Sequence, residues 1–160
     1  MKSVVQKIIQ WHHDRNIVEG ATDEGQFKKL MSEFGEYSDN LAKGRCVKDD
    51  IGDMGVVLLN IAERNDCVSL MINNGLTVFS STYSQLLYSL NDISYYMEVE
   101  SSEHYKETIK ENLIYTWESL VRTAADSGTT LEECLEVAYD DIKDRKGKLI
   151  NGTFVKESDL

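Results

Sequence analysis

The chain has 160 residues, of which 41% are hydrophobic and 28% are charged, and its formal net charge is −11. This length and composition predict one globular domain that spans residues 1–160. The negative charge argues against nucleic acid as a partner, which needs a basic surface, and against attraction to anionic membranes.

Cysteine content and hydropathy indicate a cellular compartment. The three cysteines are odd in number, far apart and without a CxxC motif, so we expect reduced thiols in a cytoplasmic protein. The N-terminus leads directly into an amphipathic pattern, which predicts that no signal peptide is present. No apolar run reaches about 18 residues, so we expect no membrane span.

Hydrophobic periodicity predicts an all-α fold. Apolar residues recur at helical spacing, and proline, which breaks helix interiors, is absent. Segment 48–70 is apolar on most sides, so we expect it in the middle of a helical bundle. Segment 16–22 resembles a loop, and segment 76–79 is ambiguous and open to an extended conformation. The expected helices span residues 3–15, 23–42, 48–70, 83–99, 103–126 and 131–144.

Local signals mark several element ends. Thr22 or Asp23 is the expected N-cap of the second helix, and Thr130 with Glu133 forms a capping box for the last one. Residues 148–155 hold an Asn-Gly dipeptide between two short arms with apolar residues, which predicts a hairpin. We therefore expect a helical bundle with a short C-terminal hairpin or extended tail.

Two acidic pairs, Glu33 with Glu36 and Asp50 with Asp53, have the i,i+3 spacing that places both carboxylates on one helix face. Such spacing is common by chance in an acidic chain, and a single pair usually marks a solvated face. The same spacing recurs at positions 63 and 66 and at positions 141 and 144.

Position on the helix distinguishes the first two pairs. Both lie at the edge of an apolar stripe, and a short connection at 43–47 would bring the two edges face to face in an antiparallel helix pair. Like charges this close destabilise a fold unless a cation compensates them, which predicts a metal site. Gly35 and Gly52 lie inside the two pairs, and we expect both to let the two helices approach closely.

The pattern resembles that of the all-α nucleoside triphosphate pyrophosphohydrolases, the superfamily of MazG, the dimeric dUTPases and the phosphoribosyl-ATP pyrophosphohydrolases. The family pattern is Glu-x-x-Glu, a spacer and Glu-x-x-Asp, and Glu33, Glu36, Asp50 and Asp53 match it. Asp50 departs from the family Glu by one methylene, which keeps a carboxylate but shortens its reach.

Longer segments look like phage-type MazG proteins. These segments are residues 29–36, 50–58 and 142–156, and strong similarity covers residues 1–66 and 131–160. Residues 70–125 carry no recognisable motif. The phage-type proteins include enzymes that hydrolyse dGTP or dATP, and the dGTP-specific MazZ branch is one candidate.

The resemblance implies hydrolysis of a (deoxy)purine triphosphate between its α and β phosphates, giving the monophosphate and pyrophosphate. Glu33, Glu36, Asp50 and Asp53 would hold two or three Mg²⁺ ions, with Mn²⁺ as an alternative, and Glu36 would take the proton of the attacking water. The family also implies a homodimer or homotetramer, in the host cytoplasm if the protein is phage-encoded.

Cations near these motifs are candidate phosphate ligands. Lys29 is one turn before Glu33, where a surface ion pair is an equal alternative. Arg145, with Lys143 and Lys146 as weaker candidates, belongs to a basic cluster in the family-like tail. Compensation of a helix dipole is the alternative reading of that cluster.

Recognition of the base is open. Asn16 and Asn151 lie in expected loops and could pair with a purine edge, although asparagine also suits turns. We expect Trp11 to fill the core rather than to stack on a base. Of His12 and His13, we expect one to be packed and one exposed, with a substrate contact as the alternative.

Two rival functions remain at this stage. The first keeps the reaction and changes the substrate to a pyrimidine nucleotide such as dUTP or dCTP, or to a non-standard nucleotide. The second is a non-enzymatic helical assembly protein whose acidic edges bind ions structurally or contact a basic partner.

Overall fold

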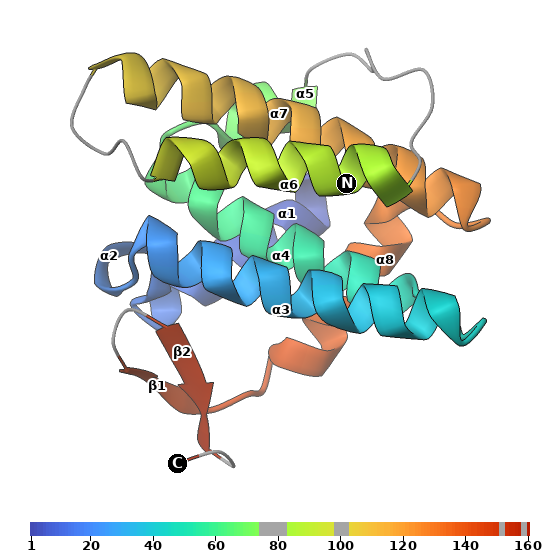
Figure 1. Cartoon of the computed structure of the whole chain (residues 1–160). Coiled ribbons are helices and arrows are strands. Elements are labelled where there is room, and N and C mark those ends of the chain that lie inside the picture. The colour runs from blue at the N-terminus through green and yellow to red at the C-terminus, as the bar shows by residue number, and fades with distance from the viewer. Residues whose placement is uncertain (74–82, 98–102, 151–152, 158–159) are drawn as a thin grey trace.

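A computed structural model describes residues 1–73, 83–97, 103–150, 153–157 and 160, and it confirms the all-α prediction with a C-terminal hairpin (Figure 1). The elements are α1 (Lys2–Asp14), α2 (Ile17–Gly20), α3 (Asp23–Ala42), α4 (Lys48–Arg64), α5 (Val68–Asn73), α6 (Tyr83–Met97), α7 (Glu103–Asp126), α8 (Leu131–Ile142), β1 (Gly147–Ile150) and β2 (Thr153–Lys156).

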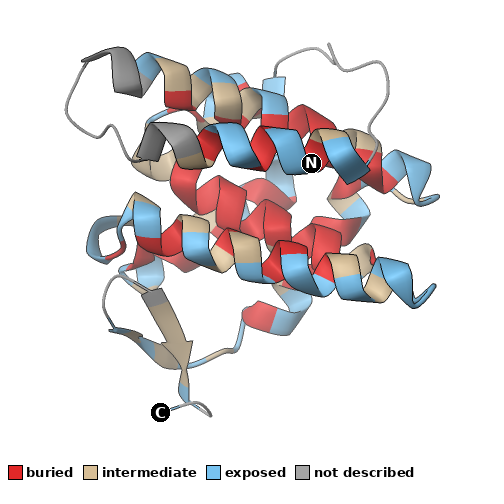
Figure 2. Cartoon of the chain, viewed as in Figure 1, coloured by how far each residue is buried: buried red, intermediate tan, exposed pale blue. Residues whose placement is uncertain are grey.

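Helix α4 forms the centre of the molecule, as its apolar sequence predicts. All its residues from Met54 to Ala62 are buried, and Figure 2 shows the helix buried along nearly its whole length. It packs against α3, α8, α7 and α1. A helix that is apolar all round can be stable only when neighbours cover each of its faces.

Two helix pairs build the bundle around α4. Helices α3 and α4 run antiparallel and are joined by the short connection at 43–47 (Figure 1). Helices α6 and α7 form a second packed pair, and α6 reaches α3 through an aromatic cluster of Phe34, Tyr37 and Tyr83. The Phe34 and Tyr83 ring centroids are 5.3 Å apart, within the usual range for aromatic pairs.

The C-terminal hairpin lies against the helices near the start of α3. Strands β1 and β2 pair antiparallel, with Lys148 opposite Val155 and Leu149 opposite Phe154. The Phe154 ring meets Trp11 of α1 edge to face, with 5.7 Å between ring centroids. The Asn-Gly dipeptide at 151–152 that predicts the turn lies outside the described residues.

Some predicted boundaries are wrong. Segment 16–22 is not only a loop, because Asn16 takes a left-handed conformation (φ 55°) and one short helix, α2, follows it. The expected helix at 48–70 is divided into α4 and α5 because Asp66 is also left-handed, with φ 53°. Helix α8 ends two residues earlier than predicted, whereas the predicted end of α6 at residue 99 and the ambiguous segment 76–79 lie outside the described residues.

Both predicted caps are confirmed. The Thr22 hydroxyl accepts a hydrogen bond from the Gly25 amide at 3.0 Å, so Thr22 rather than Asp23 is the N-cap of α3. Thr130 and Glu133 form the full capping box of α8. These side chains satisfy backbone amides that the first helical turn leaves unpaired.

Among the described residues, no helix has the length and apolar content needed to cross a bilayer.

The role expected for the two glycines is wrong, because neither glycine lies where α3 and α4 meet. A Cβ added at Gly52 would lie 2.2 Å from the Cys134 carbonyl oxygen and 2.9 Å from the Ala138 Cβ, so Gly52 lets α4 approach α8 rather than α3. A Cβ added at Gly35 would meet nothing within 4 Å. Helix α3 therefore gains no close approach from its glycine.

We expect opposite effects from alanine at these two sites. Gly52→Ala should lower the free energy of unfolding by about 1–3 kcal/mol or more, because the new methyl group overpacks the α4–α8 contact. Gly35→Ala should raise it by up to about 1 kcal/mol through helix propensity. Urea denaturation of both variants would measure the difference. Equal stability of the two variants would contradict this packing.

Candidate active site

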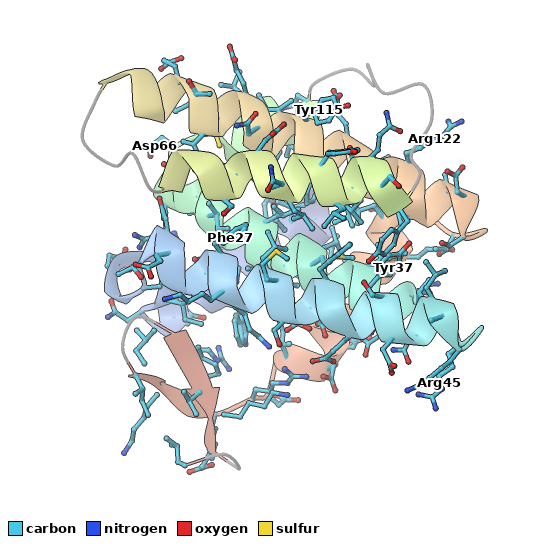
Figure 3. All side chains as sticks on the ribbon, viewed as in Figure 1. Phe27, Tyr37, Arg45, Asp66, Tyr115 and Arg122 are labelled. Atoms are coloured by element: carbon cyan, nitrogen blue, oxygen red, sulfur yellow. The ribbon has the colours of Figure 1, made fainter. Side chains whose placement is uncertain are left out.

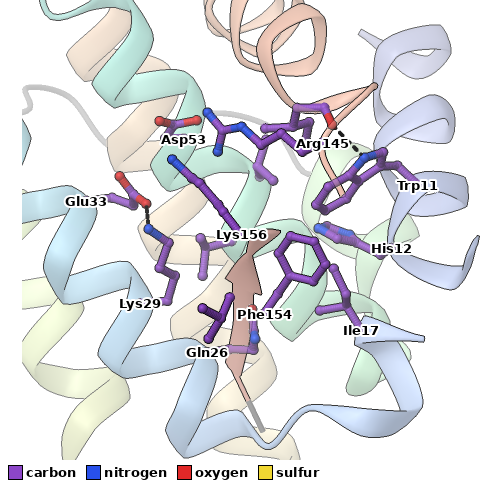
Figure 4. A pocket seen from close by; sticks show the side chains of 14 residues that line it. Trp11, His12, Ile17, Gln26, Lys29, Glu33, Asp53, Arg145, Phe154 and Lys156 are labelled. Carbon is purple, nitrogen blue, oxygen red and sulfur yellow. Dashed lines mark hydrogen bonds and ion pairs between the residues drawn. The ribbon is translucent and has the colours of Figure 1, made fainter. Parts of the chain in front are cut away.

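A cavity of about 230 Å³ lies where α3, α4, α1, the segment after α8 and strand β2 meet (Figure 4). One end is charged and the other is largely apolar. The charged end is lined by Lys29, Glu33, Asp53, Arg145 and Lys156. The apolar end is lined by Trp11, His12, Ile17, Gln26, Val56, Val57, Ile142, Phe154 and Val155.

Glu33 and Asp53 bring the two acidic motifs together at the charged end. Glu33 is 5% exposed on α3, and Asp53 is partly buried on α4. Burial raises the pKa of the Asp53 carboxyl to about 7, with further contributions from the negative charges of Glu33 and Asp49. Arg145 and Lys29 oppose this shift without cancelling it. The charged end thus combines two carboxylates with three cations, and burial makes ionisation of Asp53 costly.

The other two acidic residues lie differently. Asp50 is buried, and the Asn40 side-chain amide lies 3.0 Å from each of its carboxylate oxygens. Glu36, the predicted proton acceptor, is exposed on α3. Neither residue lines the cavity. The structure therefore brings one residue of each pair to the cavity and leaves the other beside it.

Lys29 and Arg145 reach the charged end, as predicted. Lys29 pairs with Glu33 one turn along α3, so the surface ion pair and the cavity position are both realised. Arg145 pairs with Asp141 and lines the cavity from the segment after α8. Both cations lie beside the acidic motif.

Lys156 of β2 is a cavity residue that we did not single out from the sequence. It lines the charged end, and Figure 4 shows its side chain extending toward Asp53 and Arg145. The only sequence signal was its place as the last residue of the family-like segment 142–156. Pairing of β2 with β1 is what returns Lys156 to the helices.

The remaining predicted substrate contacts lie elsewhere. Lys143 is exposed and pairs with Asp140 at 2.7 Å, and Lys146 is also exposed. Asn16 is exposed at the start of α2. These three residues do not line the cavity, and Asn151 lies outside the described residues.

Helix α1 holds the segment that carries Arg145. The Trp11 indole N–H donates to the Ile142 carbonyl at 2.9 Å. The Arg15 guanidinium donates to the carbonyls of Lys143 and Arg145 at 2.9 and 3.0 Å. Trp11 is 8% exposed, which confirms its packing role, and His12 is buried while His13 is exposed. These bonds fix the chain direction after α8 and so place Arg145.

The residues at the charged end fit Mg²⁺ by their chemistry, because carboxylate oxygens are the ligands that this ion prefers. Burial is the main cause of the raised pKa of Asp53, and the neighbouring carboxylates add a repulsion that a bound cation would relieve. Within the described part of the chain, however, no three His, Cys, Asp or Glu side chains stand together in an arrangement ready for a metal. Lys29 and Asn40 contact Glu33 and Asp50 instead.

Comparison with known proteins gives one relative and no family. The chain is 41% identical over 73 residues to an "Uncharacterized 18.2 kDa protein in rep-hol intergenic region" of Haemophilus phage HP1 (strain HP1c1). The match covers 44% of this chain and 45% of the relative. No family model matches the sequence, and no solved structure matches it.

The pKa of Asp53 predicts a pH dependence of stability. Its usual value is 3.8 and its folded value is about 7, so between these values the folded protein keeps a proton that the unfolded chain releases. The Asp53 contribution to stability is therefore full below about pH 4 and is lost as pH rises toward 7. A tenfold change in proton affinity is worth about 1.4 kcal/mol.

We expect Asp53→Asn to abolish this pH-dependent contribution to stability without enlarging the cavity. Unfolding of the metal-free wild type and variant, measured from pH 4 to pH 8, should show the variant gaining stability relative to the wild type as pH rises. A constant difference between the two proteins across this range would contradict the raised pKa. The same series with Asp39→Asn, an exposed residue of α3, provides the control.

Proposed function

We propose that the protein is a Mg²⁺-dependent nucleoside triphosphate pyrophosphohydrolase that cleaves a (deoxy)purine nucleotide such as dGTP or dATP. The observation that carries this proposal is the two-ended cavity. Its charged end combines carboxylates from both acidic motifs with three cations, and its apolar end has aromatic walls. A nucleotide has the same division between a polyanionic chain and a flat, largely apolar base.

The charged end has the groups that phosphate hydrolysis needs. Lys29, Arg145 and Lys156 come from three different elements and present positive charge around one space. Cations arranged in advance stabilise the negative charge that develops on phosphate oxygens in the transition state. Burial of the site strengthens these interactions because the effective dielectric constant is lower than in water.

Glu33 and Asp53 are the residues that would hold the metal, with Asp50 and Glu36 alongside them. When bound, Mg²⁺ supplies Lewis-acid polarisation of a phosphate oxygen and lowers the pKa of a bound water. The exposed Glu36 carboxylate remains the proposed acceptor of the water proton. The Asn40 amide holds Asp50 in place, and the Lys29 ammonium is positioned to exchange its Glu33 contact for a phosphate oxygen.

Further features of the proposal follow from the resemblance to MazG proteins. A pyrimidine nucleotide is the alternative substrate of the same reaction. We propose a homodimer or homotetramer, and a cytoplasmic location in the phage host. The similarity to a phage protein supports the proposed location in a phage host.

Nucleotide hydrolysis tests the proposal directly. We expect the wild type with Mg²⁺ to convert at least one purine triphosphate from a panel to its monophosphate and pyrophosphate. Chelation of the metal should abolish turnover, and Glu33→Gln or Asp53→Asn should lower kcat/KM at least a hundredfold, because each removes a carboxylate at the charged end. Chromatography of the products identifies the bond that is cleaved.

A matched variant separates a site effect from a charge effect. Asp39→Asn removes one negative charge from the exposed surface of α3 and should leave kcat/KM unchanged. If no triphosphate in the panel is hydrolysed, the enzymatic proposal is wrong, and the helical assembly protein becomes the better reading.

The cations should affect substrate binding in a position-specific way. Lys29→Met and Lys156→Met should each raise KM about tenfold or lower kcat by a similar factor, since a charge-assisted hydrogen bond contributes about 1.5–3 kcal/mol. Lys28→Met is the matched control, because Lys28 is the neighbouring residue on α3 but is exposed and pairs with Glu24. Steady-state kinetics that show equal losses in all three variants would argue against a phosphate role.

A further inference from the structure

A polar side chain at the apolar end of the cavity lacks a partner. His12 of α1 is 2% exposed, and its Nδ1 atom has no hydrogen bond to any described group. Buried polar groups are almost always paired, because an unpaired one costs about 1–3 kcal/mol. Gln26 of α3 is 4% exposed and lines the same cavity. The unpaired imidazole nitrogen, with an amide side chain lining the same cavity, indicates that a ligand completes this end.

The surroundings of His12 and Gln26 indicate the kind of ligand. Phe154 of β2 and Ile17 of α2 line the same end of the cavity. Figure 4 shows the His12 and Phe154 rings close together, opposite the charged residues of α3 and α4. Aromatic and aliphatic walls favour a flat ring, and a few polar atoms among them fix its orientation.

We infer that the apolar end is a subsite for the heteroaromatic base of a nucleotide. In this subsite His12 and Gln26 donate hydrogen bonds to the edge of the base and accept hydrogen bonds from it. Phe154 of the C-terminal hairpin forms one wall. The inference rests on the proposed function for the rest of the ligand. It adds His12 and Gln26 as the residues that recognise the base. From the sequence we expected this role for Asn16 and Asn151.

Charge supports a base rather than a phosphate at this end. Burial, with the charges of His13 and Arg15, lowers the pKa of His12 to about 3, so the imidazole is neutral at physiological pH. A neutral imidazole presents one N–H donor and one acceptor nitrogen. The glutamine amide presents a donor and an acceptor side by side, the combination that pairs with adjacent polar atoms of a purine.

Spacing along α3 matches the length of a nucleotide. Gln26 precedes Lys29 by three residues and Glu33 by seven, so about 4.5 and 10.5 Å of helix rise separate the base-reading end from the charged end. One helix face therefore spans from base to phosphates. Strand β2 lies on the other side of the cavity, with Phe154 at the apolar end and Lys156, about 6.6 Å further along the strand, at the charged end.

Binding measurements on the 160-residue protein separate base recognition from phosphate recognition. Calorimetry would compare the four common deoxynucleoside monophosphates with inorganic tripolyphosphate, which has no base. We expect Gln26→Leu and His12→Phe to weaken the preferred monophosphate about tenfold and to leave tripolyphosphate affinity unchanged. Gln6→Leu on exposed α1 surface is the matched control.

A second measurement uses the unmodified protein, in case a buried substitution prevents folding. The ¹⁵N resonance of His12 Nδ1 should shift on addition of the preferred monophosphate and remain in place with tripolyphosphate. Failure of the wild type to bind any monophosphate, or binding that leaves both this resonance and the variant affinities unchanged, would overturn the inference. Base-dependent binding without hydrolysis would instead contradict only the proposed reaction.

Discussion

Burial of α4 on nearly every side is the constraint on which the rest of this structure depends. A helix with so much apolar surface needs α3, α8, α7 and α1 around it, and Gly52 allows α8 to approach within van der Waals contact. The same helix carries Asp50 and Asp53 in its first two turns. Covering its apolar residues therefore also removes these two carboxylates from bulk water. Once buried, each carboxylate needs a hydrogen-bond or ion-pair partner.

The packed helix pair meets this need in two ways. The side-chain amide of Asn40 on α3 donates hydrogen bonds to the Asp50 carboxylate, so this buried group has a partner inside the bundle. Asp53 receives no such partner and lies instead beside Glu33, at a cavity that Lys29, Arg145 and Lys156 share. A carboxyl group whose pKa is raised mainly by burial, at a cavity shared by a second carboxylate and three cations, is the feature that most favours a functional site.

The site is completed by the part of the chain furthest away in sequence. Hydrogen bonds from Trp11 and Arg15 to carbonyl groups after α8 turn the C-terminal segment back along α1. The hairpin then presents Phe154, Val155 and Lys156 of β2 to the cavity, with Phe154 at the apolar end and Lys156 at the charged end. Residues from both ends of the chain thus line the cavity beside the acidic motif.

The sequence by itself determined the helices, most of their limits, the caps at Thr22 and Thr130, the hairpin and the acidic motifs, because these follow from local periodicity and local hydrogen bonding. It also indicated the antiparallel α3–α4 pair through a short connection. Only the tertiary structure decided that Gly52 faces α8, that Asp53 rather than Glu36 lines the cavity, and that Lys156 joins it. It also placed His12 and Gln26, instead of Asn16, at the apolar end. These outcomes depend on which neighbour covers each helix face and on where the chain returns after α8. Both are set by contacts between residues distant in sequence, which spacing along one helix does not encode.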